Sequence, residues 1–277
     1  MDLLDPTLRR IAELEAAAAD ALAPAEEVLS DGWRLRYNRG VTRRGNSVLP
    51  EARGQRPLAD KLNEVQAFYR SRGVVPRVQL TVAAKPPRLD DELGRRGWHR
   101  EPGASVLHHG LERLPEKPAA AGAGDVRVAQ RPDAGYQEVQ DVVVPGTAAW
   151  SEMRAAALTE AGLVPWHLAI RDDDGRAVAA GLAVLDPKRR CVGLFSLATV
   201  PDARGRGHGR ALVAAALSRA RAAGAHAAYL QVDARNDAAL RLYRRLGFTV
   251  HHAYHYRRYE PAEGADGSGV DRADPAP

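Results

Sequence analysis

Glycine and arginine alternate over residues 204–210, in the order Arg-Gly-Arg-Gly-His-Gly-Arg. The segment comes after an apolar stretch at 191–199 and opens a stretch at 210–222 with helical character, so it is predicted to join a buried strand to a helix. Unpaired N–H groups at a helix start attract anions, glycine lets the backbone approach a phosphate, and arginine adds charged donors. Residues 204–210 are therefore a candidate pyrophosphate site.

Two common phosphate-binding loops fit this segment less well. A Walker loop needs Gly-Lys-Ser or Gly-Lys-Thr, which the sequence lacks. A dinucleotide fingerprint needs an acid about 20 residues further on, at a strand end. Asp233 lies 24–28 residues beyond the glycines, so position alone leaves that alternative open. The pattern Arg-x-x-Gly-x-Gly fits a third kind of loop better.

Residues 204–209 resemble the acetyl-CoA signature of the GNAT acyltransferase superfamily, which reads Arg/Gln-x-x-Gly-x-Gly/Ala. Residues 197–201, Leu-Ala-Thr-Val-Pro, precede it where that superfamily has a strand end and a hydrophobic-x-Pro step. Residues 236–248 resemble the second signature, Asn-x-x-Ala-x-x-Leu-Tyr-x-x-x-Gly-Phe. Two signatures at the family spacing make residues 125–259 similar to an N-acyltransferase that uses acetyl-CoA.

The resemblance implies a role for each matched position. Backbone groups and one amide would hold the acetyl carbonyl and the pantetheine arm, the glycine-rich segment would hold the pyrophosphate, and a tyrosine would give a proton to the departing CoA thiolate. The residues for the acetyl carbonyl and the pantetheine arm are Leu197, Ala198, Thr199 and Asn236. Those for the pyrophosphate are Arg204, Gly205, Arg206, Gly207, His208, Gly209 and Arg210. The tyrosine is Tyr243. Tyr243 also lies at helical spacing with Leu240 and Leu246, so packing in a core is the alternative interpretation.

The general base is the part of the pattern that the sequence does not supply. Related acyltransferases often carry a glutamate on the strand before the glycine loop or on the next strand, where this chain has Gly193 and Gln231. The remaining candidates are His167, Ser196 and Asp233. A partly buried structural role is expected for His167, and capping of the following helix for Asp233. The base therefore stays unassigned.

Composition narrows the class of protein. The chain has 277 residues, a formal net charge of +5, 45% hydrophobic and 27% charged residues, as in a water-soluble globular protein. Its arginines are interleaved with acids, which argues against a nucleic-acid surface. No stretch approaches the roughly 20 apolar residues of a membrane helix, and the N-terminus has no signal-peptide pattern. A cytoplasmic location is expected, with acetyl-CoA and an amine as the partners.

Cysteine and histidine suggest neither a nucleophile nor a metal site. The single cysteine, Cys191, lies in an apolar stretch and is expected in a core. His251, His252 and His255 lie on one predicted strand, but His252 and His255 would point to opposite faces. These histidines are expected to be solvated or to line a substrate site.

Two aperiodic segments divide the chain. Residues 113–124 are predicted to be a linker and residues 261–277 a disordered tail. A catalytic α/β domain with a mixed, splayed sheet is expected at 125–260. Its predicted strands are 126–129, 166–170, 177–184, 191–199, 228–232 and 248–256, and its predicted helices 133–144, 147–159, 210–222 and 237–246.

Residues 1–112 are predicted to form a degenerate GNAT-like lobe. Residues 93–98, Leu-Gly-Arg-Arg-Gly-Trp, echo 242–248, but no glycine loop accompanies them, so this lobe is not expected to bind CoA. Residues 33–49 are similar to the N-terminal region of two-lobed, N-acetylglutamate-synthase-like acyltransferases, and Arg43 and Arg44 would either meet an acidic acceptor or be solvated. Its predicted strands are 33–37, 46–49, 74–83 and 105–111, and its predicted helices 4–23, 58–72 and 89–97.

The expected function is acetyl transfer from acetyl-CoA to a primary amine by direct attack in a ternary complex. The amine would belong to an amino acid, another small molecule or a protein. A non-catalytic acyl-CoA-binding module is the alternative, favoured by the missing glutamate and opposed by Tyr243 and the glycine loop. The acceptor and the oligomeric state do not follow from the sequence.

Overall fold

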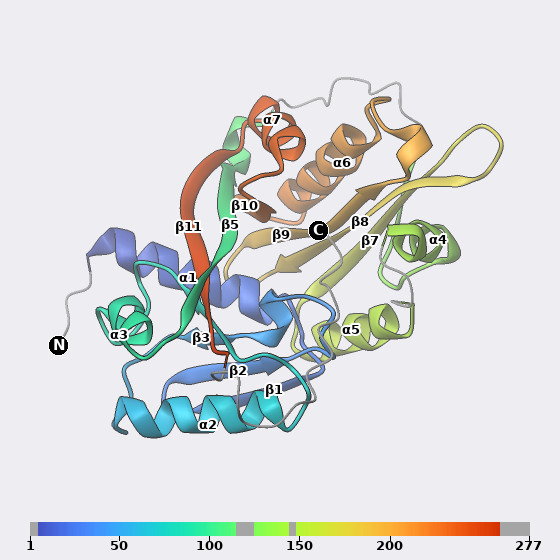
Figure 1. Ribbon diagram of the computed structural model, residues 1–277. Helices are drawn as coiled ribbons and strands as arrows, with labels where there is room; N and C mark the ends of the chain where they lie inside the picture. Colours follow the sequence, from blue (N-terminus) through green and yellow to red (C-terminus); the bar gives the residue numbers. More distant parts are fainter. Residues whose placement is uncertain (1–4, 115–124, 144–147, 261–277) are drawn as a thin grey trace. The chain divides into compact units, whose positions relative to one another are not determined.

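A computed structural model describes residues 5–114, 125–143 and 148–260 (Figure 1). Nearly all of the predicted linker and the whole predicted tail lie outside these ranges. The described residues form two compact units. Unit 1 takes them from 1–16, 24–105 and 252–277, and unit 2 from 17–23 and 106–251. No described helix is long and apolar enough to cross a membrane.

Unit 1 is a sheet with helices packed on it. Its elements are α1 (Pro6–Asp20, whose last turn belongs to unit 2), β1 (Glu26–Ser30), β2 (Trp33–Tyr37), β3 (Val48–Pro50), α2 (Leu58–Arg70), β4 (Arg77–Leu80), α3 (Leu89–Arg95), the start of β5 (His99–Gly110) and the end of β11 (Thr249–Arg258). The strand order is β1-β2-β3-β4-β11-β5. Strand β3 is parallel to β4, and the pairs β1–β2, β2–β3 and β4–β11 are antiparallel.

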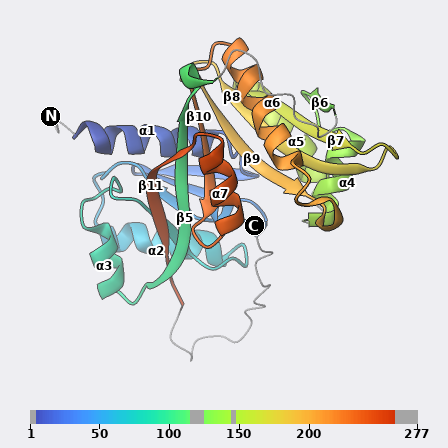
Figure 2. The same cartoon turned by 90° about the horizontal axis from the view of Figure 1, so that it is seen from above.

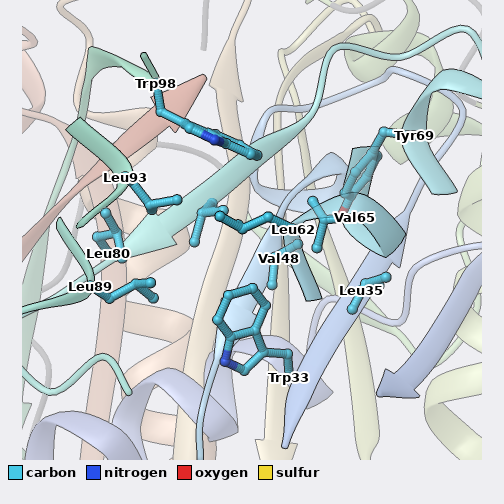
Figure 3. Close-up of a cluster of buried hydrophobic side chains, with 11 residues drawn as sticks. Trp33, Leu35, Val48, Leu62, Val65, Tyr69, Leu80, Leu89, Leu93 and Trp98 are labelled. Carbon is cyan, nitrogen blue, oxygen red and sulfur yellow. The ribbon is translucent and has the colours of Figure 1, made fainter. Parts of the chain in front are cut away.

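The two faces of this sheet differ in polarity. Trp33, Val48 and Val78 point to one face and form an apolar cluster with Leu62 and Tyr69 of α2 (Figure 3). Alternation along a strand places the intervening side chains on the other face. That second face carries buried polar groups. Apolar and polar residues therefore alternate along β2.

Several predicted features of unit 1 need correction. Strand β4 covers only Arg77–Leu80 of the predicted 74–83, and β5 begins at His99 rather than at 105. Strand β1 was not predicted, because Leu29 is 73% exposed and an edge strand that buries little has no clear alternation. The strand predicted at 46–49 begins only at Val48, after a 3-10 turn at Arg44–Asn46. Asn46 Oδ1 accepts from the N–H groups of Asn38 and Gly40 at 2.8 and 3.1 Å, which ties residue 46 to the preceding loop.

His252 is also placed differently from the expectation. It is 9% exposed, which contradicts the first of the two expectations, a solvated side chain. Its Nε2 lies 2.7 Å from Glu15 Oε1. The short spacing of three histidines along one strand gave no sign of this partner, which is far away in sequence. Within the described residues no group of acidic, histidine or cysteine side chains has the arrangement of a metal site.

The echo between residues 93–98 and 242–248 extends to the backbone. Gly97 and Gly247 have φ of +78° and +88°, and each ends a helix. Trp98 N donates to Leu93 O, and Phe248 N donates to Tyr243 O, both at 3.0 Å. These are the bonds of a Schellman-type helix end, which requires a left-handed residue and so favours glycine.

Unit 2 contains a mixed sheet in the order β5-β10-β9-β8-β7-β6. Its elements are the end of β5 (His99–Gly110), β6 (Val126–Ala129), α4 (Ala134–Val143), α5 (Ala148–Glu160), β7 (Val164–Arg171), β8 (Ala177–Asp186), β9 (Cys191–Thr199), α6 (His208–Ala222), β10 (Ala227–Asp233), α7 (Asp237–Arg245) and the start of β11. Strands β6 to β9 are antiparallel, and β10 is parallel to β9.

Helices α4 and α6 cover opposite faces of this sheet. The ring of Tyr136 on α4 lies 4.8 Å from that of His167, and Arg219 on α6 lies 5.1 Å from the ring of Trp166. Consecutive residues of β7 point to opposite faces of the sheet, so α4 and α6 lie on opposite faces. Helix α6 runs along β9 and β8 (Figures 1 and 2). Cys191 is 7% exposed, in agreement with the expected core position.

Pairing between β9 and β10 ends at Leu194 and Leu230, although both strands continue. The two strands therefore splay apart over their last residues. The α/β class and the mixed, splayed sheet predicted for the second half of the chain are confirmed. Strands β5 and β11 each contribute to both units, whereas the sequence predicts a boundary at 113–124; that boundary stays a prediction.

Candidate functional site

A bulge interrupts β9 where it leaves β10. Ala180 of β8 is opposite Ala198, but Leu182 is opposite Phe195, so β9 has one extra residue there. Ser196 has φ of +50°, and Gln140 Nε2 donates to its carbonyl oxygen at 2.8 Å. Bulges bend a strand and redirect its backbone groups. Residues 197–199 follow the bulge and are half-buried.

A glycine in the neighbouring strand lies against the bulge. A Cβ on Gly181 would lie 2.5 Å from Leu197 Cδ2, closer than side chains approach one another. Because position 181 has no side chain, Leu197 can pack over β8 while its backbone stays at the splayed edge. Residues 197–199, three of the four predicted to hold the acetyl and pantetheine groups, thus lie together on the part of β9 that β10 no longer pairs.

The glycine-rich segment leads directly into α6. Gly205 and Gly207 have φ of +78° and +88°, a region that residues with side chains seldom adopt. A Cβ on either glycine would meet no atom within 4 Å, so the backbone of both faces open space. Helix α6 begins at His208, two residues before the predicted start. The loop therefore has open space beside its glycine backbone, directly before the N-terminus of α6, where anions bind favourably.

Arginine side chains add positive charge to this loop. Arg206 and Arg210 are exposed, and Arg204 Nε donates to Thr199 O at 3.3 Å. Nδ1 of His208 is buried and has no hydrogen-bond partner in the described part of the chain. An open, glycine-lined backbone with flanking guanidinium groups fits the two phosphates of a CoA molecule.

Tyr243 lies on the helix that packs against this loop. A Cβ on Gly209 would be 3.3 Å from Leu242 Cδ2, which shows how closely α7 approaches α6. Tyr243 is 8% exposed and its ring lies 6.0 Å from that of Phe248. Burial raises the pKa of its hydroxyl to about 12, so the group keeps its proton at neutral pH. It is both a core residue and an available donor.

Asn236, rather than Asp233, caps α7. Asn236 Oδ1 accepts from Ala239 N at 3.1 Å, the usual N-cap bond. Asp233 instead accepts from Arg235, at 2.8 Å from its backbone N and 3.0 Å from its Nε. The expectation that Asp233 caps the helix was wrong because the helix starts four residues later. A contact of Asn236 with pantetheine stays a prediction and would use its Nδ2 group.

Neither Gly193 nor Gln231, at the two positions of the missing glutamate, can act as a general base. A Cβ on Gly193 would lie 2.6 Å from Phe195 Cε2 and from Tyr229 Cζ, so two aromatic rings fill that space. Both polar side-chain atoms of Gln231 are buried without a hydrogen-bond partner among the described residues. An amide has no basic nitrogen. The part of the chain that the structure describes therefore offers no carboxylate at either position.

Of the other base candidates, His167 is enclosed. It is 4% exposed, and burial, followed by the charge of Arg154, lowers its pKa to about 4. His167 is thus more deeply buried than the sequence predicts, and its structural role stays a prediction. Ser196 is exposed at the bulge and stays a candidate, while the carboxylate of Asp233 is paired with Arg235 at 2.8 Å.

A polar cluster beside the bulge was missed at the level of sequence. Arg154 of α5 is 4% exposed, lies 5.1 Å from the ring of Phe195, and donates to Ala21 O at 2.9 Å. The hydroxyl of Tyr136 is hydrogen-bonded to Ser196 and Ser151. The only available signal was an arginine within the alanine-rich stretch 150–158, which does not reveal its burial.

Solved acetyltransferase structures share this fold. A GCN5-related N-acetyltransferase from Kribbella flavida has a TM-score of 0.65 at 16% identity, over 94% of this chain and 97% of the other. A tandem GNAT protein from the clavulanic acid biosynthesis pathway has a TM-score of 0.64 at 14% identity, with the same coverages. A GCN5-related N-acetyltransferase from Sphaerobacter thermophilus has 0.56 at 18%, over 83% and 76%. These likenesses define the GNAT fold.

The sequence places the chain within that superfamily. Residues 9–257 match the family model described as "Probable histone acetyltransferase Rv0428c C-terminal". The match spans most of the chain, so the chain belongs to this family and to the GNAT superfamily. No curated protein matches the sequence.

Proposed function

We propose that unit 2 transfers the acetyl group of acetyl-CoA to a primary amine by direct attack. The observation that carries the proposal is the open glycine backbone at the start of α6, next to the helix that holds Tyr243. The pyrophosphate binds residues 204–210, and the acetyl carbonyl and pantetheine bind the backbone of residues 197–199. Family membership supports this assignment. Residues 125–260 are then the catalytic lobe and residues 1–112 a supporting lobe.

Acetyl-CoA supplies an activated carbonyl, and the chain positions it and handles protons. The amine nitrogen bonds to the carbonyl carbon, the C–S bond breaks, and the sulfur takes a proton from the Tyr243 hydroxyl, which is replenished from solvent. A group that is protonated throughout the physiological range suits this role. The raised pKa of Tyr243, about 12, keeps it in that form.

The amine must lose a proton before or after the attack. Gly193 and Gln231 cannot accept one, and the low pKa of His167, about 4, makes it a weak base. The substrate is therefore expected to react from its free-base fraction, so kcat/KM rises with pH up to the pKa of the amine itself. A plateau that begins well below the pKa of the amine would reveal a protein base instead.

The acceptor is proposed only as a class. The name of the matching family refers to histone acetylation, so a lysine-containing basic peptide belongs in any panel of amines. Amino acids and simple alkylamines complete the panel. A cytoplasmic location, without nucleic-acid or membrane partners, stays a prediction.

Release of CoA thiol from acetyl-CoA, measured with each amine, tests the proposal. We expect turnover with at least one amine, and Tyr243→Phe should lower kcat about 100-fold while KM for acetyl-CoA stays within about two-fold. Tyr254→Phe, a buried tyrosine of unit 1 (6% exposed), is the matched control and should keep full activity.

The missing glutamate favours a second candidate, a non-catalytic acyl-CoA-binding module. That function predicts binding of acetyl-CoA without turnover for every amine, and no effect of Tyr243→Phe on binding. Calorimetric titration with acetyl-CoA separates it from the enzyme. Absence of both binding and turnover would contradict both candidates.

A further inference from the structure

Unit 1 has a pocket of about 280 Å³ between one side of α1 and the polar face of its sheet. All the lining residues belong to unit 1. Ala12 and Ala16 lie one turn apart on α1 and form part of its wall, because residues four apart share a helix face. Alanines at these positions leave the space that larger side chains would fill. The pocket is smaller than those that hold drug-sized ligands.

The charged side chains that line this pocket are all acidic. They are Glu13, Glu15 and Glu51, and the lining contains no lysine, arginine or histidine. Glu13 and Glu51 are exposed, and Glu51 also pairs with Arg34 at 3.2 Å. A concave surface lined by charges of one sign concentrates their field. Since the rest of the wall is mostly apolar, the pocket matches a cation with an aliphatic body.

Glu15 is the fixed acidic group of the pocket. It is 4% exposed, and its two oxygens have different partners: Oε2 accepts from Gln79 Nε2 at 2.6 Å, and Oε1 lies 2.7 Å from His252 Nε2. A carboxylate oxygen can accept a second hydrogen bond. Glu15 is therefore oriented by the protein and still able to accept from a ligand.

The orientation of Gln79 is set from behind the pocket. Arg36, 1% exposed, donates through Nη2 to Gln79 Oε1 at 2.9 Å. The amide nitrogen of Gln79 then points to Glu15 Oε2, 2.6 Å away. Arg36, Gln79, Glu15 and His252 form one continuous buried network, and a rigid network loses little freedom when a ligand binds.

We propose that this pocket binds a small aliphatic ammonium compound, whose charged end lies against Glu15 and whose carbon chain lies against the alanines of α1. The assignment does not depend on acetyl transfer, because none of the residues proposed to bind acetyl-CoA lines the pocket. It gives unit 1, which has no glycine loop, a ligand of its own.

Calorimetric titration of the full chain without acetyl-CoA tests this site. Butylammonium is the probe, and butyrate and butanol are the anionic and neutral compounds of the same size. We expect butylammonium to bind at least about ten-fold more tightly than either comparison compound, as one well-placed ionic hydrogen bond provides. Backbone amides of α1 and β4 should exchange hydrogen more slowly in its presence.

Variants then locate the ligand. Ala12→Leu fills the pocket from an exposed helical position, where leucine is well tolerated, and should abolish binding. Ala67→Leu adds the same bulk at an exposed position of α2, outside the lining, and should bind as the unmodified chain does. Glu15→Gln keeps the shape but removes the charge, and should reduce the preference for butylammonium over butanol.

Several results would overturn the proposal. Equal affinity for the three compounds would do so, as would binding that survives Ala12→Leu, or no binding at all. Loss of butylammonium binding in Tyr243→Phe would assign the ligand to the acetyl-transfer site instead. Should Ala12→Leu fail to fold by circular dichroism, Glu15→Gln and the exchange data decide the same question.

Discussion

At the scale of single residues, burial sets the protonation of two groups in unit 2. The loss of solvation lowers the pKa of His167 to about 4 and raises that of Tyr243 to about 12. In both cases the neutral form is favoured, because an enclosed site stabilises charge poorly. His167 is thereby a poor base, whereas Tyr243 remains a proton donor over the whole physiological range.

The low pKa of His167 predicts loss of stability in acid. Between pH 6.5 and about 4 the unfolded chain binds a proton at this histidine and the folded chain does not, so stability falls as pH decreases through that window. The loss attributable to His167 is at most about 3 kcal/mol. Denaturant unfolding at pH 7 and pH 5 measures it.

His167→Gln is the control for that experiment, since it cannot take up a proton in this range. The variant should show a smaller change in unfolding free energy between the two pH values. An identical change in the variant and the unmodified chain would mean that other groups cause the acid sensitivity.

Gly193 yields a second prediction at this scale. Because the rings of Phe195 and Tyr229 occupy the space of its missing side chain, Gly193→Ala should destabilise the chain by about 1–3 kcal/mol. Thermal and denaturant unfolding measure the loss. In a double-mutant cycle, Tyr229→Leu should recover part of it, and strict additivity would contradict the steric explanation.

At the scale of elements, the two ends of α6 offer a matched pair of glycines. Gly207 precedes the helix and Gly224 follows it, with φ of +88° and +85°, and neither would bring a Cβ within 4 Å of another atom. Alanine at either position therefore strains the backbone by about 1–2 kcal/mol without a clash. Only position 207 belongs to the proposed pyrophosphate loop.

Gly207→Ala should raise KM for acetyl-CoA by roughly ten-fold, because strain changes the direction of the loop N–H groups. Gly224→Ala should lower stability by a similar amount and leave KM unchanged. Kinetics at varied acetyl-CoA concentration, together with thermal unfolding, separate the two effects. Equal KM values in both variants would argue against a cofactor role for the loop.

Elements with strong periodicity or turn residues were predicted well from the sequence. Strands β7, β8 and β9 and helices α6 and α7 all lie within a few residues of their predicted positions. Strand β1 was not, because its residues stay largely exposed. The bulge at Ser196 has no local sequence signature either, since it arises from the register between β8 and β9.

At the scale of the whole molecule, the compact units do not follow the order of the chain. Unit 2 includes residues 17–23 and the end of β5, which precede the predicted linker. Within it, Arg154 donates to Ala21 O at 2.9 Å, Arg189 pairs with Asp20 at 2.8 Å, and Leu111 N donates to His226 O at 2.8 Å. The segment after the linker is therefore incomplete by itself.

A chain of residues 113–277 is expected to be insoluble or unfolded, because β10 loses its neighbour β5 and exposes an unpaired edge. Circular dichroism and soluble yield measure this outcome. Co-expression with residues 1–112 should restore a soluble complex. The chain 1–260 keeps every described residue and serves as the control.

A stable, active fragment of residues 113–277 would contradict this expectation. It would also support lobes that fold independently on either side of residues 113–124, as the sequence alone predicts. Failure of the fragment even with residues 1–112 present would indicate that the chain must be continuous to fold.

Residues 204–209 and 236–248 were enough to predict the GNAT superfamily and the α/β class, because both signatures are local patterns of glycine, arginine and apolar residues at the ends of helices. Only the tertiary structure showed that aromatic rings fill the space at Gly193, that Glu15 holds His252, and that β5 and β11 each serve both units. The physical reason is the range of the interactions. Helix caps and periodicity act within a few residues, whereas packing and strand pairing join residues that the chain keeps far apart.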